Sequence, residues 1–430
     1  MQDGRMEQTS TQPPWRPRAG FITLMLLGFA LVVLVRMPQI LAQGGRFWAE
    51  EGVVYFANSW NWPWYQAWFA IHTGYINFIA GFGTWLGLQL GGLDHAPLVT
   101  VLLALLVQAL APFIILTHDF PWRRSRLACA SAVLLCAVPP GTAEVWLNTI
   151  TSQFHLGLAA ALILAAPPKT KRLFVLDALL LAVGVLSGPA TSFLLPLFLL
   201  RGVLTRSRVM LLFSLILLAG FGLQLGIYLT HPVPARSGQA SLATLLAVIA
   251  LHGPVMAFTG MHGAAVIGRC FLALHQAQAL LWPPVLILVL FYALLGWLVA
   301  GARFGRATLA LLLAAQIVIL FVSFDKALSP DFTDSMGAGW GGRYAFIPLV
   351  LTGLILTGAV CATSWARRAV AFFALLLVLV VGVSNDRTGT ANFANGPAWG
   401  PQAKAWQVRH WNMFKIWPGT TGWIVALGHR

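Results

Sequence analysis

Charged residues are scarce in this sequence: only 9% of its 430 residues are Asp, Glu, Lys or Arg, whereas 58% are apolar. A soluble protein of this length would fold into two or three domains with far more surface charge, so that class is excluded. The mean hydropathy of +0.78 and the many uncharged runs of span length predict an all-α, polytopic integral membrane protein.

Acidic residues are the scarcer sign of charge, with 12 Asp and Glu against 27 Lys and Arg, which leaves a formal net charge of +15. In so apolar a chain this excess is typical of loops that flank membrane spans, so no nucleic acid is expected as a partner. Cysteine is also rare. The four cysteines lie in apolar stretches without a CxxC or Cys/His cluster, which argues against a disulfide framework and a cysteine-ligated zinc site.

Long apolar runs define the predicted spans. Residues 1–20 are polar and are expected to form a cytoplasmic tail, and the run 21–35 lacks an A-x-A cleavage site, so we interpret it as a retained first span. Further runs long enough to cross a bilayer cover 71–90, 97–117, 208–230, 279–301, 307–324, 344–361 and 369–385. About four helices are expected within 127–203, and 241–258 is either a span or part of an outer loop. The prediction is about 11 to 13 spans in one unit, 21–385.

Basic clusters orient these spans, because Lys and Arg concentrate on the cytoplasmic side of membrane proteins. The clusters expected there are Arg16/Arg18, Arg123/Arg124/Arg126, Lys169/Lys171/Arg172, Arg201/Arg206/Arg208, Arg303/Arg306 and Arg367/Arg368. The segments then expected on the outer side are 44–70, 140–153, 231–278, 326–343 and a Trp- and Gly-rich tail, 386–430.

One conflict in this scheme concerns residues 71–117. Two complete crossings, by 71–90 and 97–117, would place the basic cluster at 123–126 on the outer side. A re-entrant or surface-lying segment would remove the conflict, and so would a basic cluster that violates the rule.

The first outer loop places Glu50 and Glu51 a few residues beyond the first span. A carboxylate in a partly apolar site near the membrane surface can serve as a general base that takes a proton from a hydroxyl. The alternative is a solvated loop carboxylate, or one that pairs with Arg46. The aromatic residues that follow are typical of the outer interface, where they shape a groove or form only an aromatic belt. They are Trp60, Trp62, Trp64, Tyr65 and Trp68.

Three fragments resemble the C-type (GT-C) membrane glycosyltransferases: FWAEEGVVYF with its continuation HTGYINF, PPGTAEVWLNTITSQFHLGL, and GGRYAFIPLV. Members of that superfamily transfer a sugar from a polyprenyl-phosphate carrier to an acceptor on the outer face of the membrane. The resemblance implies a hexosyltransferase of the cell inner or plasma membrane. Its implied partners are a polyprenyl-phosphate-linked sugar donor, a lipid or glycan acceptor and the lipid bilayer.

The resemblance also implies a catalytic residue, because the superfamily carries an essential Asp or Glu in its first outer loop. That position maps onto Glu50 or Glu51. We favour Glu51 as the general base over Glu50, because Gly52 after it allows close approach of backbone and substrate.

The second fragment, together with HTGYINF, supplies candidate substrate-binding residues. Polar side chains at membrane depth are costly unless they face a wet cavity, so a cluster of them suggests a site for sugar hydroxyls. For each one, helix capping or an interhelical hydrogen bond is the alternative. The candidates are His72, Glu144, Asn148, Gln153 and His155.

The third fragment places Arg343 and Tyr344 at the mouth of the next predicted span. A guanidinium suits a phosphate bidentately, so Arg343 is the expected ligand of the carrier phosphate. The alternative is that Arg343 forms an ion pair with Asp331 or Asp334 and does not bind a phosphate. Two further basic residues that could hold the phosphate are Arg269 and Lys326.

No cofactor is predicted. A divalent cation could bind Asp325, Asp331 and Asp334, but their spacing matches no oxygen-ligand motif. The alternative function is a secondary transporter or lipid flippase, because Asp177 lies well within an apolar run. A non-catalytic assembly subunit is a third possibility, which no sequence feature favours.

Overall fold

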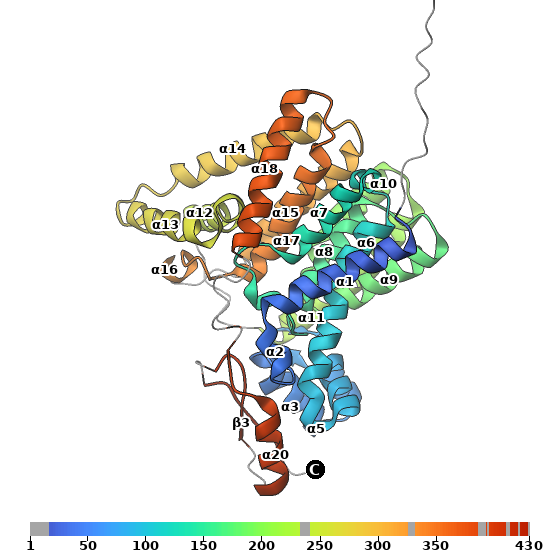
Figure 1. Ribbon diagram of the computed structural model, residues 1–430, viewed down its shortest axis with the longest axis vertical. Helices are drawn as coiled ribbons and strands as arrows, with labels where there is room; N and C mark the ends of the chain where they lie inside the picture. The colour runs from blue at the N-terminus through green and yellow to red at the C-terminus, as the bar shows by residue number, and fades with distance from the viewer. Residues whose placement is uncertain are drawn as a thin grey trace, which may run out of the picture.

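The computed structural model describes residues 17–232, 241–325, 332–385, 393, 395–409, 413–419 and 422–428, so most of the expected N-terminal tail lies outside the described residues. Within them, eight helical segments are long and apolar enough to cross a bilayer. They are α1 (Ala19–Arg36), α5 with α6 (Phe78–Gln108 and Leu110–Thr117), α11 (Arg208–Thr230), α12 with α13 (Leu242–Ala250 and Met256–Gln276), α14 (Trp282–Ala300), α15 (Arg306–Asp325), α17 (Gly342–Ala359) and α18 (Trp365–Ser384). The prediction of an all-α, multi-span integral membrane protein is confirmed (Figure 1).

Four shorter helices lie between α6 and α11 in the sequence. They are α7 (Arg126–Ala137), α8 (Ser152–Ala165), α9 (Lys171–Leu186) and α10 (Leu195–Leu204), which agrees with the expectation of about four helices in this region. The expected span 71–90 begins differently, because residues 71–76 form a small antiparallel pair, β1 (Ile71–His72) with β2 (Tyr75–Ile76). Helix α5 starts only after it.

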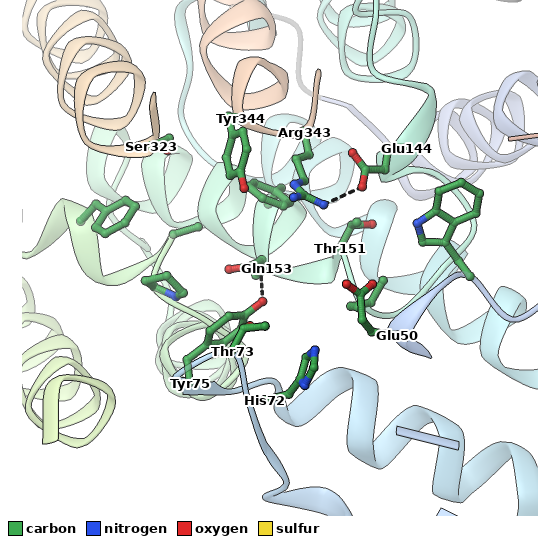
Figure 2. Close-up of a pocket in the computed structure, with 16 residues that line it drawn as sticks. Glu50, His72, Thr73, Tyr75, Glu144, Thr151, Gln153, Ser323, Arg343 and Tyr344 are labelled. Atoms are coloured by element: carbon green, nitrogen blue, oxygen red, sulfur yellow. Dashed lines mark hydrogen bonds and ion pairs between the residues drawn. The ribbon is translucent and has the colours of Figure 1, made fainter. Parts of the chain in front are cut away.

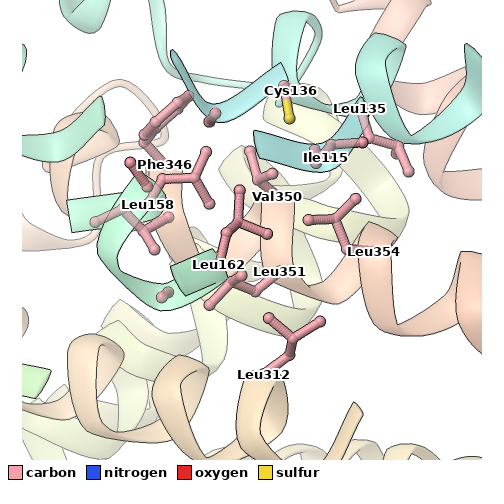
Figure 3. Packing of buried hydrophobic residues seen from close by; sticks show 14 of the residues in the cluster. Ile115, Leu135, Cys136, Leu158, Leu162, Leu312, Phe346, Val350, Leu351 and Leu354 are labelled. Atoms are coloured by element: carbon pink, nitrogen blue, oxygen red, sulfur yellow. The ribbon is translucent and has the colours of Figure 1, made fainter. Parts of the chain in front are cut away.

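The centre of the bundle is formed by α8 and α17. All 14 residues of α8 are buried, and its Ala- and Gly-rich sequence allows neighbouring helices to approach closely. Leu158 and Leu162 of α8 lie in one hydrophobic cluster with Phe346, Val350 and Leu351 of α17 (Figure 3). Both helices begin at the same cleft, so two deeply buried helices position the cleft residues at their first turns.

Helix α5 turns back on itself at Gly92, whose φ of 58° and ψ of −160° are accessible essentially only to glycine. A Cβ added at Gly87 would lie 2.8 Å from the carbonyl oxygen of Ala96, so the two arms run side by side. The first arm, 78–91, is about 21 Å long at 1.5 Å per residue, which is too short to cross a bilayer of about 30 Å. The second arm continues into α6. The fold-back is the geometry of the re-entrant alternative, in which the region supplies one crossing and the basic cluster 123–126 is expected on the cytoplasmic side.

A second fold-back occurs at Gly260 (φ 65°, ψ −166°) inside α13. A Cβ added at Gly268 would lie 3.5 Å from the side chain of Leu251, in the turn η6 (Leu251–Val255) that precedes α13. The weaker span candidate of the sequence, 241–258, is thus helical from Leu242 onward and belongs to one of the eight apolar segments.

The first loop and the C-terminal tail pack together at one end of the molecule (Figure 1). The loop contains α2 (Pro38–Ala42), η1 (Glu51–Phe56), α3 (Ala57–Asn61) and α4 (Trp64–Trp68), and the tail contains α20 (Trp399–Arg409), β3 (Met413–Lys415) and β4 (Ile424–Ala426). The backbone N–H of Ala49 donates to the Trp417 carbonyl (2.6 Å), and the indole N–H of Trp399 donates to the Leu93 carbonyl (2.6 Å). A hydrophobic cluster joins the two segments through Phe47, Phe56, Trp60, Trp399, Phe414 and Ile416.

Candidate active site

A cleft opens where α8 and α17 begin, beside the first loop. It encloses about 860 Å³ including its mouth. Polar side chains from four separate segments converge in it (Figure 2). They are Glu50, His72, Tyr75, Glu144, Gln153, Arg343 and Tyr344. The sequence singled out six of these seven residues.

The two adjacent glutamates have opposite environments. Glu50 lines the cleft, and its carboxylate makes no hydrogen bond or ion pair with any residue that the structure describes. Glu51 is 0% exposed and points away from the cleft, because successive residues of a helical turn diverge by about 100°. Of the two glutamates, the structure therefore places Glu50, and not the favoured Glu51, at the cleft.

Glu51 instead holds two loops together. Its Oε1 accepts from the backbone N–H (2.6 Å) and the hydroxyl (2.5 Å) of Thr149, and its Oε2 accepts from the backbone N–H of Trp48 (2.9 Å). Burial raises the pKa of Glu51, and these hydrogen bonds and the nearby charge of Arg46 act in the opposite direction. Its position is structural, because it fixes the first loop against the segment that carries Glu144.

Gly52 has a different role from the expected close approach of backbone and substrate. A Cβ there would lie 2.5 Å from Cδ1 of Ile416 and 3.2 Å from Cβ of Phe47. The missing side chain therefore makes room for the C-terminal tail and not for a substrate.

Arg46 forms no direct bond with either glutamate. Its guanidinium donates to the backbone carbonyls of Phe393 and Trp146, the latter at 2.9 Å. It lies over the rings of Trp48 (4.9 Å) and Trp417 (5.1 Å), and burial lowers its pKa to about 9. Neither Glu50 nor Glu51 is therefore paired with Arg46, which was the alternative considered for the first-loop glutamates.

Arg343 and Glu144 face Glu50 from the opposite side of the cleft (Figure 2). Nη1 of Arg343 donates to Oε1 of Glu144 at 2.6 Å, and the guanidinium lies 5.0 Å from the centre of the Tyr344 ring. The partner of Arg343 is thus Glu144 and not Asp334. The other candidates from that loop, Lys326 and Asp331, lie outside the described residues. Arg269 is not part of the cleft.

Gln153 and Tyr75 form one wall of the cleft, with the Gln153 amide donating to the Tyr75 hydroxyl at 3.3 Å. Gly188 (φ 141°) makes this arrangement possible, since a Cβ there would lie 2.2 Å from Oε1 of Gln153. His72 lies nearby on β1, beside Glu50 (Figure 2).

The sequence did not identify several other residues of the cleft. Tyr75 lies within the quoted HTGYINF fragment, three residues after His72, and the antiparallel β1–β2 pairing brings the two side by side. The apolar wall consists of Pro189 and Ala190, which lie in the SGPAT break between α9 and α10, and Phe193, which follows it. A helix break next to a polar cluster is the signal that marks this wall.

Asn148 and His155 do not reach the cleft. Asn148 is fully buried and donates to the carbonyls of Glu144 (2.8 Å) and Trp146 (3.1 Å), while its Oδ1 accepts from Thr151. His155 is bonded to the carbonyl of Val145 (3.0 Å). Both residues therefore bond to the loop that precedes α8, as in the structural alternative, and neither of them lines the cleft.

No group of three or more His, Cys, Asp or Glu side chains suited to a metal ion occurs in the part of the chain that the structure describes. Asp331, one of the three aspartates considered for a cation, is outside that part.

Asp177, the residue that suggested a transporter, is buried between α6 and α9. Its Oδ2 lies 3.0 Å from Nε2 of His118, and neither residue lines the cleft. The mid-span carboxylate thus has a local partner that accounts for its position.

The comparisons with known proteins found a likeness to a solved structure. No family model and no curated protein matches the chain. Among solved structures, the chain is similar to the crystal structure of ArnT from Cupriavidus metallidurans bound to undecaprenyl phosphate. The sequence identity is 15%, the TM-score is 0.45, and the match covers 91% of this chain and 69% of that chain.

Proposed function

We propose that this protein is a membrane glycosyltransferase that moves a sugar from a polyprenyl-phosphate carrier to a hydroxyl of a lipid or glycan acceptor on the outer face of the membrane. The observation that carries the proposal is the cleft itself, in which an unpartnered carboxylate among the described residues, Glu50, faces the guanidinium of Arg343. The fragments that resemble GT-C enzymes contribute both residues, and they come from segments almost 300 residues apart in the sequence.

The two charges suit the two halves of a displacement reaction. Glu50 takes the proton of the acceptor hydroxyl, whose oxygen attacks the anomeric carbon of the sugar. The bond between that carbon and the phosphate oxygen breaks, and the electron pair leaves with the polyprenyl phosphate. Arg343 stabilises the charge that develops on this leaving group.

The remaining residues of the cleft bind and orient the sugar in this proposal. Gln153, Tyr75 and His72 supply hydrogen-bond donors and acceptors for hydroxyl groups, and Tyr344 and Phe193 supply apolar faces. The exposed aromatic residues of α4 and its flanks, Trp62, Trp64, Tyr65 and Phe69, are typical of a membrane interface, which supports a position of this end of the molecule at the outer surface.

The test is a transfer assay with membranes that contain the parent protein or Glu50→Gln, supplied with a labelled polyprenyl-phosphate sugar. The amide keeps the shape of the side chain but cannot take a proton, so transfer should fall by about 10²–10⁴-fold at normal protein abundance. Transfer by Glu50→Gln near the parent rate would exclude the mechanism, and absence of transfer by the parent with any donor of this class would exclude the function.

A further inference from the structure

The ion pair between Arg343 and Glu144 lies inside the cleft and not in the protein core. The two side chains are 41% and 23% exposed, and both line the cleft. An ion pair that solvent and ligands can reach contributes little to folding stability, typically about 0–1 kcal/mol. Its effect on what binds in the cleft is therefore the more important property.

Glu144 occupies part of the guanidinium that a phosphate would use. Only Nη1 of Arg343 contacts Glu144, at 2.6 Å, and the guanidinium also has a hydrogen bond with the Tyr344 side chain, so the remaining N–H groups of the fork are those that a second anion can use. A carboxylate and a phosphate present oxygens with similar spacing to a guanidinium, and each lowers the attraction that the other experiences. Glu144 and a bound phosphate are thus competitors for one cation.

Glu144 also borders a second, smaller cavity, which has room for about one water molecule. Glu144 lines both the cleft and this cavity, and three glycines, Gly141, Gly339 and Gly342, form much of the cavity wall. A carboxylate that gives up Arg343 therefore has a small cavity beside it.

The need for a competitor follows from the reaction proposed above, on which this inference rests. The donor is a phosphodiester with one negative charge, whereas the product, a polyprenyl monophosphate, carries about −1.5 to −2 at neutral pH. A guanidinium without a counter-ion would therefore hold the product more tightly than the donor, and product release would limit turnover.

We propose that Glu144 is the resident counter-ion of Arg343, that the carrier phosphate displaces it on binding, and that its return to Arg343 expels the polyprenyl phosphate product. Glu144 is a positioning residue in this scheme, because it acts through Arg343 and makes no bond in the reaction.

Binding of undecaprenyl phosphate to the purified protein in nanodiscs tests this directly. Glu144→Gln should bind the lipid about fivefold more tightly than the parent, because a competitor worth about 1 kcal/mol is removed, and the gain should shrink at high salt. Glu144→Asp keeps the charge and should stay near the parent. Glu50→Gln is the matched control, since it removes a carboxylate from the same cleft without touching Arg343, and its affinity should change less.

The outcomes separate this inference from the function on which it rests. Tighter binding cannot result from misfolding, so a gain in Glu144→Gln supports the counter-ion role, and stronger inhibition of transfer by added undecaprenyl phosphate in that variant would accompany it. Equal or weaker binding by Glu144→Gln, with the parent binding and Arg343→Ala failing to bind, would overturn the counter-ion role alone. Equal binding by the parent and Arg343→Ala, or none by the parent, would overturn the phosphate site of the proposed function as well.

Discussion

The carboxylate of Glu51 accepts hydrogen bonds from both the backbone N–H and the hydroxyl of Thr149, a residue that lies 98 positions further along the chain. This contact joins the first loop to the segment just before α8. Since Glu50 precedes Glu51 directly, the same contact fixes the direction in which the proposed base points.

Replacement of the two glutamates by alanine should separate stability from activity. Glu51→Ala leaves the buried backbone N–H groups of Trp48 and Thr149 without acceptors, which should cost about 2–6 kcal/mol of unfolding free energy. Glu50→Ala leaves no buried donor unsatisfied and should unfold like the parent. Thermal unfolding in detergent measures both, and a Glu51→Ala protein as stable as the parent would contradict the structural role.

The raised pKa of Glu51 predicts a pH dependence of stability. Because the folded protein holds the Glu51 proton more tightly than the unfolded chain, the contribution of Glu51 is complete below its ordinary pKa of 4.5 and is lost as the pH rises through the folded value. The Tm of the parent relative to Glu51→Gln should therefore fall as the pH is raised above 4.5. A constant difference across that range would show that burial does not perturb this carboxyl.

Arg343 should act on the donor and not on the acceptor. Loss of a hydrogen-bonded charge should raise the KM for the polyprenyl-phosphate sugar by about 10–100-fold in Arg343→Ala. Arg343→Lys should recover only part of this, because an ammonium lacks the fork. Steady-state transfer kinetics at varied donor and fixed acceptor provide the measurement. Unchanged donor kinetics in Arg343→Ala would make the residue structural.

Gly188→Ala should disturb the sugar-binding wall. The added Cβ would be forced against the Gln153 amide and would strain a backbone with φ of 141°, so Gln153 must leave its place beside Tyr75. We expect a rise in KM of about 3–10-fold, which is the value of one lost hydrogen bond. Gly222→Ala in α11 is the control, because a Cβ there meets nothing within 4 Å. Equal KM values for Gly188→Ala and Gly222→Ala would show that Gln153 does not contribute to substrate binding.

The topology can be tested with single cysteines in a background without the four native ones, of which Cys270 and Cys361 are exposed. Lys404→Cys, in the tail, should react with an impermeant reagent in intact cells, whereas Arg303→Cys should react only after the inner face is opened. The opposite labelling pattern would show that the tail is cytoplasmic and that position 303 lies on the outer side.

The sequence predicted the membrane-embedded helical fold because hydrophobic runs and basic clusters are properties of single segments. It also located Glu50, Glu144, Gln153 and Arg343, because polar residues are conspicuous in an apolar chain. It favoured Glu51 over Glu50, because the contacts of Thr149 and Ile416 that leave Glu50 at the cleft come from distant parts of the chain. The turn at Gly92 was also not evident, because a glycine within a helical run signals a fold-back only when the two arms are seen to pack together.

The contact between Ala49 and Trp417 has a consequence for how the protein matures. During synthesis the loop that carries Glu50 emerges long before its packing partners around Trp417. A nascent chain that lacks the segment around Trp417 therefore also lacks the contacts that support this side of the cleft. The hydrogen bond between these two segments makes the supported cleft a late event, which follows synthesis of the segment around Trp417.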